Sequence, residues 1–142
     1  MNLPHERRET VSPGGWLRHA RSDIRLARLA LKEEILPEQI CFHAQQAAEK
    51  ALKAVLLHKK VDFPFTHDLE ELVEVSLNGG ITVPDELHDL GNLTPYAVQA
   101  RYPGFWGEIT DADLDEAVTL AEKALAWASL IIGSGSDHTH ET

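Results

Sequence analysis

The chain has 142 residues, of which 43% are hydrophobic and 25% charged. This composition is typical of one globular domain and excludes a wholly disordered chain. A single cysteine excludes an intrachain disulfide, the N-terminus lacks the apolar stretch of a secretory signal, and no apolar run approaches the roughly 20 residues that cross a bilayer. We therefore expect one soluble, cytoplasmic domain with no membrane segment.

Charge is divided unevenly along the chain. Residues 1–60 hold eleven Lys or Arg against seven Asp or Glu, whereas residues 61–142 hold two against sixteen. This division is typical either of a half that faces nucleic acid or of helices that pair with one another inside the fold.

Two long helices are predicted in the first 60 residues. Residues 1–15 form a flexible leader that ends in Pro-Gly-Gly, and a first helix begins at Trp16 because apolar residues then recur every three or four positions. Pro37 separates it from a second helix over 38–60. That helix carries a strip of small side chains that allows close approach of neighbouring helices: Ala44, Ala47, Ala48, Ala51 and Ala54.

Three further helices complete the predicted fold. Thr66 caps a third helix that ends at the Asn-Gly-Gly of 78–80, and a fourth runs from 84 to 101 with a kink at Pro95. The last begins at Thr110 or Asp111 and stops at Gly133, followed by a disordered polar tail over 133–142. The fold class is all-α, an antiparallel four- to five-helix up-and-down bundle over residues 16–132.

Three segments resemble the HEPN family of prokaryotic domains. They are FHAQQAAEKALKA at 42–54, THDL at 66–69 and ARYP at 100–103. The resemblance implies a four- to five-helix bundle that dimerises, often works with a minimal nucleotidyltransferase in a toxin–antitoxin system, and acts in nucleotide or RNA chemistry.

Many HEPN proteins are metal-independent ribonucleases, and the resemblance extends to only part of their motif. In those enzymes an arginine is followed, after four to six intervening residues, by a histidine. Here Arg101 is followed by Tyr-Pro-Gly-Phe-Trp-Gly-Glu, and the next histidines are His138 and His140 in the tail. Because the general acid or base is missing from this window, the sequence favours a role without catalysis.

Arg101, Tyr96 and Tyr102 are candidates for nucleotide or RNA binding. The arginine can contact a phosphate, and a tyrosine can stack on a base or donate its hydroxyl. The alternative is a structural arginine that ties this segment to the acidic last helix.

Polar residues on the second helix are a second candidate set. Gln46, Lys50 and Lys53 share one helical face, beside Gln45 and Glu49. Buried polar groups require partners, so we expect a hydrogen-bonded network. It either binds nucleotide or RNA, or holds the bundle and its dimer in register, and the structural role is favoured.

Histidines and a stripe of cations complete the candidates. His67 could replace the missing base, although a hydrogen bond within its loop is favoured, and no residue spacing supports a metal or cofactor site. The basic stripe recurs at spacings of three and four, and consists of Arg18, Arg21, Arg25, Arg28 and Lys32. It either faces RNA or an acidic partner, or pairs with the acids of the C-terminal half; pairing is favoured.

Two functions remain from the sequence. The first is a homodimeric binding module for nucleotide or RNA that acts with a minimal nucleotidyltransferase. The alternative is a ribonuclease toxin built around Arg101, with His67 or Tyr102 as a substitute base.

Overall fold

The computed structural model describes residues 12–96 and 109–135, and in this part of the chain every regular element is helical. The elements are α2 (Pro13–Ala30), α3 (Pro37–His58), α4 (Leu69–Asn78), the 3-10 helix η1 (Asp85–Leu93) and α6 (Asp111–Gly135). The predicted all-helical bundle is therefore confirmed.

The first two helices follow the predicted pattern with shifted boundaries. Helix α2 begins at Pro13, three residues before the predicted start, because the Ser12 side chain accepts a hydrogen bond from the Gly15 amide at 2.9 Å. Proline suits this first turn because its missing amide hydrogen would have no partner there. Helix α3 begins at Pro37 and ends at His58, one and two residues before the predicted bounds of 38 and 60.

The predicted cap of the third helix was wrong by two residues. Asp68 caps α4 by accepting from the Glu70 amide at 3.0 Å, while the Thr66 hydroxyl accepts from the Asp68 amide. The predicted fourth helix is a 3-10 helix over Asp85–Leu93, and residues 97–101 of the prediction lie outside the described residues. The last helix passes Gly133 and reaches Gly135.

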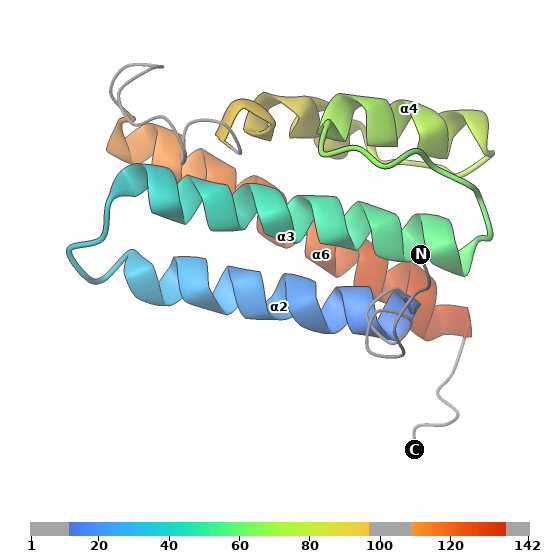
Figure 1. Cartoon of the computed structure of the whole chain (residues 1–142), viewed down its shortest axis with the longest axis horizontal. Coiled ribbons are helices and arrows are strands. Elements are labelled where there is room, and N and C mark those ends of the chain that lie inside the picture. Colours follow the sequence, from blue (N-terminus) through green and yellow to red (C-terminus); the bar gives the residue numbers. More distant parts are fainter. Residues whose placement is uncertain (1–11, 97–108, 136–142) are drawn as a thin grey trace, which may run out of the picture.

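Figure 1 shows α2 and α3 lying side by side in opposite directions, with α6 behind them and antiparallel to α2. Helix α4 and η1 cover the other side of α3. Helix α3 is the centre of the core, and all five alanines of its small-residue strip are fully buried. Their short side chains let three neighbours approach one helix closely, as predicted.

Candidate functional site

A buried polar network lies on α3, where the sequence predicted one. The Glu49 carboxylate is 2.9 Å from the Lys53 ammonium and accepts from Gln45 Nε2 at 3.1 Å. Gln45, Glu49 and Lys53 are each at most 4% exposed. The same carboxylate lies 2.9 Å from Nδ1 of His67. His67 therefore contacts α3 rather than making the predicted side-chain hydrogen bond within its own loop.

Lys53 of this network is surrounded by aromatic rings. Its ammonium lies 5.6 Å from the Trp16 ring centroid, 6.0 Å from that of Phe63 and 5.7 Å from that of Phe65. Ring faces attract a cation, so they add to the stabilisation that Glu49 provides. The Lys53 ammonium is thus held by groups of the protein itself, which supports a structural role for this residue.

Lys50 belongs to a second, separate cluster between α2 and α3. Asp23 accepts from the Lys50 ammonium at 2.7 Å, and its other oxygen is 3.0 Å from Nδ1 of His43. The Asp23 side chain is only 12% exposed. Gln46, the remaining member of the candidate face, is half-buried, and no side-chain hydrogen bond joins it to another described residue. The three candidates on α3 therefore do not form one shared site.

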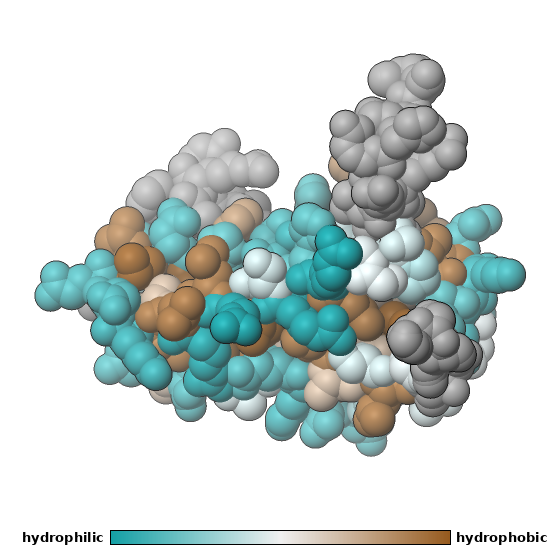
Figure 2. All heavy atoms as spheres, turned by 90° about the horizontal axis from the view of Figure 1, so that it is seen from below, coloured by the Kyte–Doolittle hydropathy of each residue, from teal (hydrophilic) through white to brown (hydrophobic). Residues whose placement is uncertain are grey.

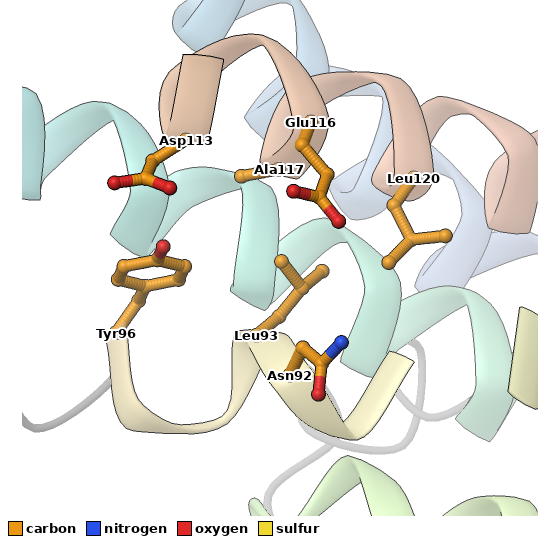
Figure 3. A pocket seen from close by; sticks show the side chains of 7 residues that line it. All are labelled: Asn92, Leu93, Tyr96, Asp113, Glu116, Ala117 and Leu120. Atoms are coloured by element: carbon orange, nitrogen blue, oxygen red, sulfur yellow. The ribbon is translucent and has the colours of Figure 1, made fainter. Parts of the chain in front are cut away.

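Tyr96 lines a hollow of about 190 Å³ between η1 and the start of α6. Figure 3 shows its phenol ring pointing toward Asp113, with Glu116 on the next turn of the same wall. Burial, helped by the nearby Cys41, Asp113 and Glu116, raises the pKa of Tyr96 to about 12. Burial, followed by Asp113 and Glu38, likewise raises the pKa of Cys41 to about 12. Two acids repel a phosphate, so these described residues suit a base or an amine better.

The basic stripe lies on the exposed side of α2, and its predicted pairing with acids was largely wrong. Arg28 alone has such a partner among the described residues: it binds both carboxylate oxygens of Glu122 at 2.6 Å. The pKa of Glu122 is lowered by this hydrogen bond. The rest of the stripe is exposed, with no described acid within ion-pair distance: Arg18, Arg21, Arg25 and Lys32.

For Arg18, Arg21 and Arg25, the lack of partners is explained by the distribution of charge along α6. The acids of α6 end at Glu122, and residues 124–135 contain no charged side chain. Because α6 runs antiparallel to α2, this uncharged half lies toward the N-terminal end of α2, where the stripe begins. The positive charge there is therefore not neutralised by the adjacent helix.

Apolar side chains are exposed where α2 leads into α3. Figure 2 shows hydrophobic atoms gathered toward that end of the molecule. An apolar hollow here is lined by Leu26, Leu29, Ala30 and Ile35 together with the polar residues Glu33, Gln39 and His43. Leu29 is 62% exposed, and Leu36 beside the hollow is 59% exposed. A contiguous apolar surface of this kind is typical of a protein contact.

Other candidate chemistry is limited within the described ranges. No described helix is long and apolar enough to cross a membrane, and no described residues form a cluster of three or more metal-ligating side chains. Arg101 and Tyr102 lie outside the described residues, as do His138 and His140.

The three sequence segments and this helical arrangement can be compared with known proteins. The HEPN domain model matches residues 14–131. The chain belongs to the HEPN family. Among solved structures it is similar to the crystal structure of ST0689, an archaeal HEPN homologue, with a TM-score of 0.69 and 26% sequence identity. That match covers 85% of this chain and 98% of the homologue. No curated protein matches.

The structure of this HEPN domain adds residues that the sequence alone did not single out. Asp23 joins α2 to α3, and nothing in its sequence context distinguishes it from other helical acids. Phe65 is 87% exposed. Its position next to the THDL segment was visible, but its exposure depends on how the loop folds back over α3.

Proposed function

We propose that this HEPN domain is a homodimeric binding module for RNA or nucleotide that acts with a minimal nucleotidyltransferase in a toxin–antitoxin-like system. The observation that carries the RNA part is that four cations of the basic stripe on α2 are exposed and have no described acid within ion-pair distance: Arg18, Arg21, Arg25 and Lys32. Arginine forms paired hydrogen bonds with phosphate oxygens, and the release of counterions from the RNA favours binding. The stripe acts against the net charge of −10 of the whole chain, which disfavours tight non-specific binding of nucleic acid.

The homodimer is supported by the apolar hollow between the ends of α2 and α3. Burying exposed leucine and isoleucine side chains against an identical surface gives a self-complementary contact of the kind that two-fold dimers use. The hollow lies at the C-terminal end of α2, at Leu26, Leu29 and Ala30, whereas the basic stripe begins at Arg18. A dimer formed through the hollow therefore leaves the N-terminal part of the stripe accessible.

Salt dependence of RNA binding tests this function. For single-stranded RNA, the logarithm of the binding constant falls with the logarithm of salt concentration by about 0.7 per phosphate contact. Replacing Arg21 and Arg25 with glutamine should reduce that slope by about 1.4. The control variant removes two cations that acids already neutralise, Arg28 and Lys123. It should change the slope much less; equal slopes in both variants, or no binding by the wild type, would contradict the proposal.

The ribonuclease alternative gains support from one specific contact. Glu49 holds Nδ1 of His67, and the His67 side chain is 56% exposed. A carboxylate that fixes one ring nitrogen leaves the other available as a general base. Cleavage of a labelled single-stranded RNA that is lost in both Arg101→Ala and His67→Ala would favour this enzyme over the binding module.

A further inference from the structure

The loop between α3 and α4 exposes an aromatic side chain that contributes little to the core. Phe65 is 87% exposed, the highest value of any large apolar residue in the described ranges. Pro64 and Asp68 beside it are exposed as well, and the half-buried rings of Trp16 and Phe63 lie with it around Lys53. The Phe65 ring is therefore accessible to a flat ligand that stacks on it.

The loop around this ring is held in place by the buried network of α3. Gln45 Nε2 donates to the His67 carbonyl oxygen at 3.3 Å, and Nδ1 of His67 lies 2.9 Å from Glu49. The Thr66 hydroxyl accepts from the Asp68 amide at 3.0 Å. These contacts fix the chain on the C-terminal side of Phe65. A ligand that stacks on the ring therefore meets a preformed surface, which lowers the cost of binding.

Two hydrogen-bonding and charged groups lie next to the ring. The imidazole of His67 has its centroid 5.8 Å from that of Phe65, in an edge-on arrangement. Because the acceptor Glu49 faces Nδ1, the neutral ring has its hydrogen on that nitrogen and offers Nε2 as an acceptor. The Lys53 ammonium lies 5.7 Å from the Phe65 ring centroid. Exposed Lys59 and Lys60 stand at the beginning of the same loop.

We propose that Phe65 and His67 form a subsite for a nucleobase, with Phe65 as the stacking surface and Nε2 of His67 as a hydrogen-bond acceptor. Stacking on an aromatic side chain is the usual means of holding unpaired bases of single-stranded nucleic acid. This inference rests on the proposed function, and it adds the position of a base to the phosphate contacts of the α2 stripe. The base can belong to RNA or to a free nucleotide.

Fluorescence anisotropy with three probes tests the subsite. They are a fluorescein-labelled 12-nucleotide oligoadenylate, an abasic oligomer of the same length, and a fluorescent AMP analogue. Phe65→Ala should weaken binding of the oligoadenylate by about 5- to 150-fold and leave binding of the abasic oligomer unchanged. Phe65→Trp should preserve or strengthen binding of the oligoadenylate. His67→Ala should weaken it by about 2- to 10-fold. Leu130→Ala, which truncates another side chain that is 74% exposed, is the control.

The outcomes separate this inference from the function on which it rests. If the wild type binds oligoadenylate and Phe65→Ala binds it equally well, the subsite is wrong while RNA binding stands. If the wild type binds none of the three probes, the proposed function is wrong, and so is the subsite that rests on it. Binding of AMP that depends on Phe65 would support the subsite and assign the base to a free nucleotide. A Phe65→Ala effect of equal size on the abasic oligomer would overturn base stacking.

Discussion

Removal of Glu49 should be among the most destabilising single changes available in this domain. Glu49→Leu leaves the Lys53 ammonium 4% exposed without an anion, and deprives Gln45 and His67 of an acceptor. Breaking a buried ion pair from one side costs about 3–5 kcal/mol. For a chain of this length, that loss lowers the melting temperature by about 10–15 °C. Lys53→Met should cost less, because Glu49 keeps both His67 and Gln45 as partners.

Urea unfolding followed by tryptophan fluorescence measures this pair through a double-mutant cycle. The variants are Glu49→Leu, Lys53→Met and their combination, in which two apolar side chains replace the ion pair. We expect a coupling energy of at least about 2 kcal/mol, since the double variant leaves no unpaired buried charge. The half-exposed pair of Arg28 and Glu122 is the control, with a coupling of about 0.2–1 kcal/mol. Equal coupling energies in the two pairs would refute the assignment of the buried network as structural.

Three other changes test separate parts of the structure. The raised pKa of Cys41, about 12, means that the folded chain keeps a proton that the unfolded chain releases at high pH. The free energy of unfolding should therefore fall above pH 9, by up to about 1.4 kcal/mol per pH unit. In urea titrations at pH 8–11, Cys41→Ala should remove this part of the pH dependence. The lowered pKa of Glu122 acts in the opposite sense. The stabilisation that its ion pair with Arg28 gives to the fold is present above pH 4.5 and is lost as the pH falls. Arg28→Met should therefore reduce the loss of unfolding free energy in acid by at most about 1 kcal/mol. Gly80 has a φ of +85°, which favours glycine, and Gly80→Ala should cost about 1 kcal/mol in urea unfolding. An unchanged pH profile in the first two variants, or an unchanged urea midpoint in the third, would count against the corresponding interpretation.

The helical core could be predicted from sequence because its signal is local. Apolar residues at spacings of three and four predicted the first helix and its buried face, and the alanines of α3 predicted the close packing that burial confirms. Helix ends were less predictable. Each of these helix starts depends on one capping side chain, Ser12 or Asp68. A nearby residue with a similar hydrogen-bonding group, such as Thr66, can be mistaken for the cap.

The sites were harder to predict because their contacts join distant segments. The spacing of Gln46, Lys50 and Lys53 correctly placed polar groups on one helix, but Asp23 and His67, which determine what those groups do, come from other elements. The basic stripe shows the same difficulty. Its pairing depended on which half of α6 lies beside α2, and the sequence did not reveal that the acidic half reaches only Arg28.

Light scattering coupled to size-exclusion chromatography tests the central claim most directly. The protein should be loaded with an equimolar 12-nucleotide single-stranded RNA at low salt. A homodimeric binding module predicts one peak that contains intact RNA and has a protein mass of about twice the 15.8 kDa of one chain. A protein peak near 15.8 kDa, with the RNA eluting separately or cleaved, would contradict it.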